Sequence, residues 1–323
     1  MGRAKRPGEF DLIARYFRPL AAGNAGALEL ADDAALIDVP LGRRLVVTAD
    51  LLTAGVHFLE EDPPDLIARK ALRVNLSDLA AMAAKPLAYF LTCAFPETVE
   101  EAWIAAFAAG LAQDQEEFDI VLMGGDTTAT PGPLTLSITA LGTVEAGREL
   151  RRSTAKKGDL IAVSGTIGDA MLGLARLQGR LDPLPGDDYL IDRYRLPQPR
   201  ISLARQLAAL GLATAALDVS DGLVADLGHI CEASGLAAQV EVSRVPLSRA
   251  GREAVKREPR LLEALLTGGD DYELLFTLPA DRRGELADLP VTVIGRMQEG
   301  DGVKVVDPAG EAMTLKRGGF QHF

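Results

Sequence analysis

Apolar segments of strand length alternate along this chain with segments of helical periodicity. The strand-like segments are rich in Val, Ile, Leu and Thr and are bounded by Gly, Pro or Asp, which is typical of buried β-strands. Because strands and helices alternate, helices are expected to pack on sheets, and the predicted fold class is α/β or α+β. The predicted strands are residues 44–50, 87–95, 119–125, 134–144, 160–165, 215–220, 237–242, 273–278 and 291–295.

Helical periodicity is clearest in three segments of the first half, residues 10–17, 70–86 and 96–111. Thr98 and Glu101 have the spacing of a capping box, so the third helix is expected to begin near them. The residues expected on the buried faces are Phe10, Ile13 and Phe17 of the first helix, Ala71, Leu72, Leu76, Leu79, Ala80 and Ala83 of the second, and Ile104, Phe107 and Leu111 of the third.

The length of 323 residues exceeds what one hydrophobic core usually serves, so two domains are expected. Segment 145–159 is charged, holds two glycines and follows a long predicted strand, which makes it the best boundary. The predicted domains are therefore residues 1–147 and 148–323. Segment 182–200 carries four prolines and is expected to be an extended excursion of the second domain.

The composition, 48% apolar and 25% charged, is that of a soluble globular protein. A net charge of −12 argues against duplex nucleic acid or an anionic membrane surface as a partner. No apolar run reaches the roughly 18 residues of a membrane span, and the N-terminus shows no signal peptide. Cys93 and Cys231 lie in apolar segments and are expected to be buried thiols, so we expect a cytoplasmic protein.

Several aspartates interrupt or end the apolar segments. Strand ends and element starts, where these residues are expected, are the places at which α/β proteins bind ligands. The aspartates are Asp32, Asp33, Asp50, Asp78, Asp126, Asp218, Asp221, Asp270 and Asp271.

Each aspartate taken alone has a structural explanation as a turn or capping residue, and Asp221 is well placed to cap a helix that begins after it. Asp78 is the exception, because it lies inside a helical pattern. Taken together, carboxylates that converge repel one another unless a cation lies between them. Oxygen ligands with few histidines favour Mg²⁺, which usually also binds substrate phosphates.

Two glycine-rich segments could complete such a site. Residues 123–128 could let the backbone approach a ligand closely, and residues 164–170 could present the amides of a helix start to a phosphate. The second pattern is weak evidence, since many such turns bind nothing. The P-loop and protein-kinase motifs do not occur in the sequence.

A series of motifs covering nearly the whole chain resembles the thiamine-phosphate kinase family, which makes thiamine diphosphate from thiamine monophosphate and ATP. This family is related to aminoimidazole ribonucleotide synthetase, selenophosphate synthetase and the hydrogenase maturation protein. The motifs are "GEFDLIARYF", "DDAAL", "VVTADLLTAGVHF", "KALRVNLSDLAAMAAKP", "GGDTT", "RRSTAKKGDLIAVSGTIGD", "LDVSDGLVADLGHI", "GGDDYELLFT" and the final "GGFQHF".

The resemblance implies a two-domain aminoimidazole ribonucleotide synthetase-like fold. Its N-terminal domain would bind ATP and Mg²⁺ and form a homodimer through its sheet, and its C-terminal domain would be α/β. By position in the motifs, the resemblance implies Asp33, Thr48, Asp50, Asp78, Asp126, Asp218 and Asp221 as metal ligands, Gly125, Asp126, Arg152 and Ser220 as ATP contacts, and His57, Asp270 and Phe320 as contacts of thiamine monophosphate. Asn75 and Ser77 would support the turn that holds Asp78. Arg151 is adjacent to Arg152, and the sequence does not choose between them.

Four positions depart from the family pattern. Ala31 stands where Gly is usual, and Ala49 stands where a hydroxyl residue is usual, which removes one possible contact to a metal or its water. Asp270 is one methylene shorter than the usual Glu, and Gln321 replaces an Asp.

The acceptor phosphate has a second pKa of ~6 and is therefore anionic near neutral pH, so the expected mechanism is in-line transfer without a protein general base. Unphosphorylated thiamine, which would need a base, should be a poor acceptor.

Two alternatives remain. The chain could be another ATP-dependent enzyme of the superfamily, such as a synthetase that activates an amide, although cysteines are absent where selenophosphate synthetase and the maturation protein would carry them. It could also be a nucleotide-binding protein without activity, which a complete set of metal aspartates argues against.

Overall fold

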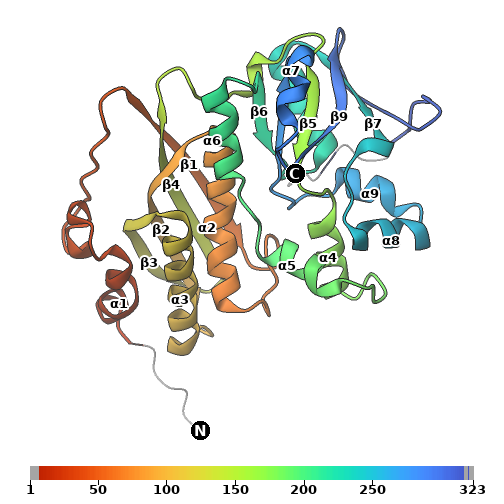
Figure 1. The fold of residues 1–323 in the computed structure, drawn as a ribbon. Coiled ribbons are helices and arrows are strands. Elements are labelled where there is room, and N and C mark those ends of the chain that lie inside the picture. Colours follow the sequence, from red (N-terminus) through yellow and green to blue (C-terminus); the bar gives the residue numbers. More distant parts are fainter. Residues whose placement is uncertain (1–6, 316–318, 320–323) are drawn as a thin grey trace. The chain divides into compact units, whose positions relative to one another are not determined.

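The computed structural model describes residues 7–315 and Gly319. The chain divides into two compact units, the first formed by Met1–Leu79 with Ala84–Ala146 and the second by Ala80–Ala83 with Gly147–Phe323. Each unit has its own sheet (Figure 1). The α/β fold class is therefore confirmed.

The first unit is built on a four-stranded sheet in the order β1-β4-β2-β3. Strand β2 pairs antiparallel with β4 and parallel with β3, and β1 pairs antiparallel with β4. The strands are β1 (Arg43–Thr53), β2 (Lys85–Pro96), β3 (Val121–Thr130) and β4 (Thr135–Glu145), and the helices are α1 (Glu9–Leu12), α2 (Pro64–Ala81) and α3 (Glu101–Phe118).

Helices α2 and α3 lie side by side on the sheet (Figure 1). The apolar stripe that the sequence predicts for α3 is buried, and a buried acid joins the two helices. Asp114 of α3 accepts hydrogen bonds from Arg69 at 2.7 Å and from Arg73 at 2.8 and 2.9 Å. Two guanidinium groups therefore compensate the cost of burying this carboxylate.

The second unit is built on a six-stranded sheet in the order β10-β7-β9-β5-β8-β6. The strands are β5 (Leu160–Ser164), β6 (Ala215–Asp218), β7 (Ala237–Glu241), β8 (Leu274–Leu278), β9 (Val291–Gln298) and β10 (Gly302–Val306). The helices are α4 (Asp169–Leu177), α5 (Asp187–Arg195), α6 (Ile201–Leu210), α7 (Leu223–Ser234), α8 (Arg249–Arg257) and α9 (Leu261–Thr267).

Alternating residues of β5 face opposite sides of this sheet, so both faces need cover. Ile161 and Val163 belong to the core that includes α7, whereas Leu160 and Ala162 belong to the core that includes α6. The result is a layer of helix on each face of the sheet, and both faces of β5 are buried.

All the predicted strands are present, but their ends differ, and β10 was not predicted. Strands β1 and β3 continue beyond Asp50 and Asp126, so these aspartates lie inside strands and not at strand ends. The sheet extends them because each residue of β1 finds a partner on β4 as far as Thr53.

Several predictions about helices were wrong in detail. Helix α2 ends at Ala81 because the chain turns into β2 at Lys85, so residues 70–86 are not one helix. The N-cap of α3 is Glu100 and has no side-chain hydrogen bond, so the predicted capping box does not form. Phe10 is 82% exposed, whereas Phe17 is buried as predicted.

The segment predicted to be extended, residues 182–200, contains helix α5. Its prolines lie outside the helix, and Arg193 and Arg195 in its last turn interact favourably with the C-terminal end of the helix dipole.

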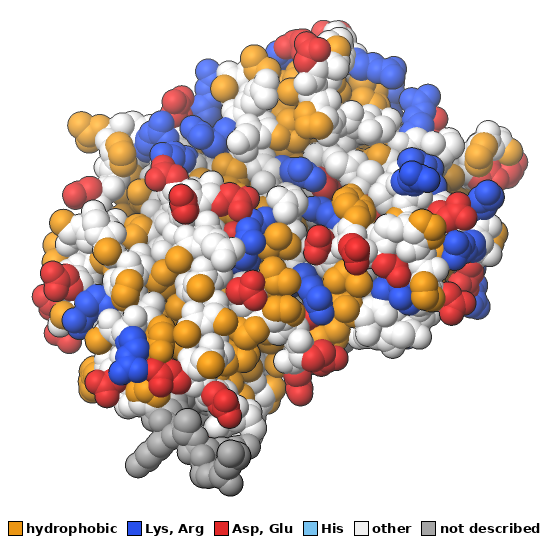
Figure 2. All heavy atoms as spheres, turned by 60° about the horizontal axis from the view of Figure 1, so that its bottom comes forward, with side chains coloured by type: hydrophobic (Ala, Val, Ile, Leu, Met, Phe, Trp, Pro, Cys, Tyr) orange, Lys and Arg blue, Asp and Glu red, His pale blue; other side chains and the backbone are white. Residues whose placement is uncertain are grey.

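Cys93 and Cys231 are buried free thiols, as predicted. Among the described residues, no helix is long and apolar enough to cross a membrane. On the face that Figure 2 draws, acidic and basic side chains are interspersed among apolar ones.

Candidate active site

Thr48, Asp50 and Asp78 form the first group of predicted site residues. Thr48 of β1 donates a hydrogen bond from Oγ1 to Oδ2 of Asp78 on α2, at 2.5 Å. Burial, and then the negative charge of Asp78, raise the pKa of Asp50 to about 6. The helix therefore holds its aspartate against the strand, next to a second carboxylate whose charge is destabilised there.

Asn75 lies one helical turn before Asp78. Its Nδ2 donates to the carbonyl oxygen of Ala71 at 3.0 Å, which is a local bond within α2. Its Oδ1 is buried and has no hydrogen-bond partner among the described residues.

Asp33, Gly125 and Asp126 line a cavity of about 400 Å³ in the first unit. Apolar residues such as Phe17 and Met123 form other parts of its wall. The backbone amide of Thr127 donates to Oδ1 of Asp126 at 2.8 Å, which orients this carboxylate.

The predicted aspartates of the first unit lie on different elements. Strands β1 and β3 are the two edges of the sheet, with β4 and β2 between them. The backbones at Asp50 on β1 and Asp126 on β3 are therefore about 14 Å apart, three strand spacings. The first unit holds two acidic groups, one around Asp78 and one at the cavity.

Gly125 is required by the sheet itself. A Cβ at this position would lie 1.8 Å from the carbonyl oxygen of Leu91 on β2. The glycine thus permits close approach of a neighbouring strand, which explains it without a ligand.

In the second unit, the loop after β6 is folded around a carboxylate. Asp226 of α7 accepts hydrogen bonds at Oδ2 from the amides of Ser220, Asp221 and Gly222, at 3.0, 3.0 and 3.1 Å. The N-cap of α7 is Gly222 and has no side-chain hydrogen bond, so the predicted cap by Asp221 is wrong. The helix start is capped from within by Asp226, which leaves the carboxylate of Asp221 for other contacts.

Asp226 and His229 were not among the predicted site residues. One ligand atom each of Asp221, Asp226 and His229 lie within 4.8 Å of one another. Burial and the nearby charge of Asp218 raise the pKa of Asp226 to about 7. The spacing of Asp226 and His229, three residues on a helix, was the signal that could have placed them on one face.

Asp270 lies beside this loop. Its amide donates to the carbonyl oxygen of Ser220 at 2.8 Å, and the amide of Tyr272 donates to that of Val219 at 2.8 Å. The hydroxyl of Tyr272 donates to Oδ1 of Asp270 at 3.3 Å. The second unit therefore brings Asp218 at the end of β6 close to Ser220, Asp221 and Asp270 of two adjoining loops.

The neighbouring Asp271 has a structural role. Its carboxylate is fully buried and accepts from the amides of Gly168 at 2.7 Å and Ala170 at 3.4 Å, at the start of α4. The expectation that residues 164–170 present these amides to a phosphate is therefore wrong, because a carboxylate of the same chain already occupies them. Burial raises the pKa of Asp271.

The remaining predicted residues are more exposed or lie outside the described part. His57 is half-buried, and its Nδ1 accepts from the amide of Thr53 at 3.0 Å. Arg152 is exposed, whereas Arg151 forms an ion pair with Glu149 at 2.5 Å. Phe320 and Gln321 lie outside the described residues.

Two family models match the chain. Residues 31–144 match the N-terminal domain, and residues 156–308 the C-terminal domain, of AIR synthase related proteins. The chain thus belongs to the two-domain class of AIR synthase related proteins.

Relatives that match over the full length identify the family within this class. The chain is 43% identical to the thiamine-monophosphate kinase of Caulobacter vibrioides over 99% of this chain and 92% of that protein, and 43% identical to that of Escherichia coli K12 over 98% of each. The crystal structure of thiamine-monophosphate kinase from Stenotrophomonas maltophilia matches with a TM-score of 0.83 and 45% identity, covering 95% of this chain and 98% of that one. AaThiL, solved in complex with AMPPCP and TMP, matches with a TM-score of 0.79 and 31% identity over 100% of both chains. The chain belongs to the thiamine-monophosphate kinase family, and it is a kinase.

Proposed function

We propose that the protein transfers the γ-phosphoryl group of ATP to thiamine monophosphate and so forms thiamine diphosphate, with Mg²⁺ required. The observation that carries the proposal is the full-length similarity to AaThiL, which was solved with AMPPCP and TMP. Relatives 43% identical over nearly the whole chain, all thiamine-monophosphate kinases, support the same acceptor.

Oxygen ligands suited to Mg²⁺ are present in both units. In the first unit, Thr48, Asp50 and Asp78 would hold one Mg²⁺ site, and Asp33 and Asp126 would hold another at the cavity. In the second unit, Asp218 and Asp221 would bind Mg²⁺. The raised pKa of Asp50 supports this fit, because a cation between Asp50 and Asp78 would relieve the repulsion that contributes to it. When bound, Mg²⁺ neutralises charge on the phosphates of ATP and acceptor.

The proposed ATP contacts are Gly125, Asp126, Arg152 and Ser220. The cavity at Gly125 and Asp126 combines apolar walls with carboxylates, which suits a nucleoside and a metal-bound phosphate. Because Arg151 is already paired with Glu149, Arg152 is the better choice for the triphosphate.

The acceptor side is assigned to His57, Asp270 and Phe320. Since Nδ1 of His57 accepts a hydrogen bond from Thr53, the neutral ring carries its proton on Nε2 and would donate it to a phosphate oxygen. A histidine in this state is a phosphate contact and not a base. The acceptor supplies its own anionic oxygen, so transfer is in line and needs no protein general base.

The N-terminal domain, residues 1–147, would bind ATP and Mg²⁺ and form a homodimer, and residues 148–323 would form the α/β C-terminal domain. Strand β1 supports the dimer, because it is an edge strand on which Leu45, Val47 and Leu51 are 40%, 56% and 60% exposed. Apolar side chains along a sheet edge are usually covered by a partner. Two buried thiols suit a cytoplasmic location.

The test is a turnover assay with ATP and Mg²⁺, with either thiamine monophosphate or thiamine as acceptor. We expect thiamine diphosphate from the monophosphate, no reaction in EDTA, and little product from thiamine. ATP hydrolysis that does not depend on thiamine monophosphate would contradict the proposed acceptor. Comparable rates with both acceptors would contradict the base-free mechanism.

A further inference from the structure

The loop that carries Asp270 has an unusual backbone. Asp270 and Tyr272 have φ values of 72° and 50°, in the left-handed region that residues other than glycine rarely adopt. Such a backbone is strained, and it persists only where the surroundings impose it.

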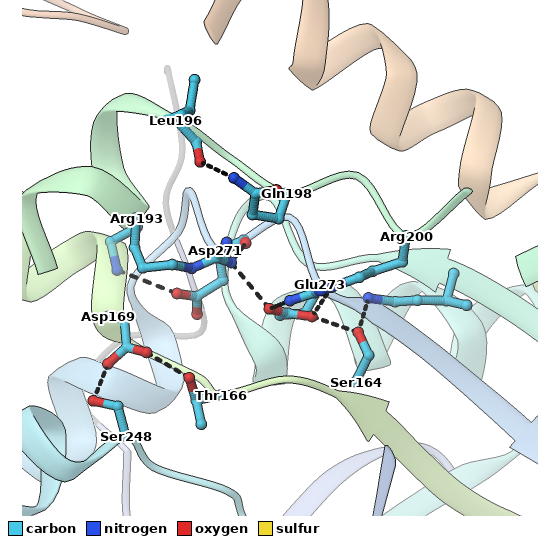
Figure 3. A network of polar contacts seen from close by, with 12 residues as sticks. Ser164, Thr166, Asp169, Arg193, Leu196, Gln198, Arg200, Ser248, Asp271 and Glu273 are labelled. Atoms are coloured by element: carbon cyan, nitrogen blue, oxygen red, sulfur yellow. Dashed lines mark hydrogen bonds and ion pairs between the residues drawn. The ribbon is translucent and has the colours of Figure 1, made fainter. Parts of the chain in front are cut away.

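The two residues that alternate with them, Asp271 and Glu273, point into the unit and are 0% and 1% exposed. The carboxylate of Glu273 accepts hydrogen bonds from Arg200 at 2.6 and 2.5 Å, from Arg193 at 3.0 Å and from the hydroxyl of Ser164 at 2.5 Å. Figure 3 shows this carboxylate among its three partners.

Arg193 connects this buried carboxylate to the strained loop. The same Nη2 that contacts Glu273 donates to the backbone carbonyl oxygen of Asp271 at 2.8 Å. Asp271 lies between the two left-handed residues. The carboxylate of Glu273 therefore positions the guanidinium group of Arg193, which donates a hydrogen bond to the backbone in the middle of the loop.

The carboxylate is also closely packed against the backbone. A Cβ on Gly165 would lie 2.2 Å from Oε1 of Glu273, so the carboxylate is seated directly against this glycine. The backbone carbonyl of Glu273 accepts from the amide of Val219 at 2.8 Å, which joins the loop to the chain just before Ser220.

A buried ion network of this kind is a poor source of stability, because an apolar cluster of the same volume would do as well or better. It does, however, specify one geometry, since a bidentate guanidinium contact has a fixed direction. Its contacts end on the loop that presents Asp270.

We propose that Glu273, through Arg193, is a positioning residue that sets the place of Asp270 toward the acceptor. This inference rests on the proposed function, in which Asp270 contacts thiamine monophosphate. Glu273 and Arg193 touch no substrate themselves and act through the backbone of the loop.

The test is the E273Q variant, which keeps the shape of the side chain and removes its charge. We expect KM for thiamine monophosphate to rise between about 10- and 100-fold, while KM for ATP changes less than about 2-fold. The matched control is D114N in the first unit, since Asp114 is also a fully buried carboxylate held by two arginines. D114N should lower Tm without separating the two KM values.

A double-mutant cycle distinguishes positioning from general damage. If Glu273 acts through Asp270, E273Q should change KM for thiamine monophosphate less than about 2-fold in a D270N background. An undiminished effect in that background, or equal changes of both KM values in E273Q alone, would overturn the proposal. If E273Q does not fold, R193K decides in the same assays, because lysine keeps the charge but cannot bridge Glu273 and the carbonyl of Asp271 in the same geometry.

The wild-type assay separates this inference from the proposed function. Wild-type protein that does not use thiamine monophosphate refutes the function itself. Wild-type turnover with no KM split in the variants refutes only the positioning role.

Discussion

Thr48 on β1 donates a 2.5 Å hydrogen bond to Asp78 on α2, across 30 positions of sequence. This contact gives Asp78, a polar interruption of the helical pattern of α2, a hydrogen-bond partner on the sheet. The negative charge of Asp78 contributes to the raised pKa of a second acid, Asp50, and we propose this pair as a cation site.

We predict that D78N lowers kcat at saturating Mg²⁺ by at least about 100-fold without loss of the fold. Asparagine can still accept the bond from Thr48, and its neutrality relieves Asp50, so Tm in EDTA should be unchanged or higher. The control is D119N. Asp119 is exposed and forms an ion pair with Lys85, so this variant should retain activity. Near-normal turnover of D78N would rule out the metal role, and an unfolded variant would indicate a structural one.

Asp226 predicts a pH dependence of stability. Its pKa is about 7 in the folded protein, and the ordinary value is 3.8. Between these values the folded protein holds a proton that the unfolded chain has released, so the free energy of unfolding falls as pH rises from about 4 to about 7. The loss attributable to this group is on the order of a few kcal/mol.

Denaturant unfolding of wild type and D226N in EDTA, at several pH values from 4.5 to 7.5, measures this contribution. The stability of the wild type relative to D226N should decrease with rising pH, because D226N lacks the titrating group. A difference that stays constant over this range would show that Asp226 titrates near its ordinary value.

The exposed edge of β1 predicts a homodimer. Sedimentation at micromolar concentration should give about 69 kDa, twice the 34.3 kDa of one chain. The double variant V47E/L51E should shift the protein to monomer, because it places charges on the apolar edge. L210E, a similarly exposed leucine of the second unit, should remain a dimer. A monomeric wild type would refute the assembly.

The adjacent acids Asp270 and Asp271 should respond differently to the same substitution. D271N replaces a buried acceptor of two amides and should cost about 1–3 kcal/mol of stability. D270N should leave Tm nearly unchanged, since asparagine tolerates the left-handed backbone well, and should raise KM for thiamine monophosphate. Unfolding curves and acceptor titrations of both variants make the comparison. Equal destabilisation by both would contradict this division of roles.

Much of the fold could be predicted because its signals are local. The apolar periodicity of the strands and of α3 depends only on which residues recur at spacings of two or of three and four. The aspartates could be found as polar interruptions of those patterns, and the order of motifs sufficed to indicate the family. Strand ends were less certain, since Asp50 and Asp126 lie inside strands that their neighbours extend.

The roles of individual acids could not be predicted in the same way. Asp221 had the sequence position of a helix cap, yet Asp226 supplies the acceptor from inside the helix. Residues 164–170 looked able to bind a phosphate, yet Asp271, about 100 residues later, accepts the same amides. In both cases the decisive partner is a side chain that no local pattern marks.

The sequence by itself determined that this chain forms α/β structure, carries a set of carboxylates suited to Mg²⁺ and belongs with a particular family of kinases. Only the tertiary structure decided which carboxylates lie near one another and which accept hydrogen bonds at helix starts. It alone also decided that Arg193 connects Glu273 to the loop of Asp270. The physical reason is that periodicity is a property of neighbouring residues, whereas the cost of a buried charge depends on donors that folding brings from distant segments.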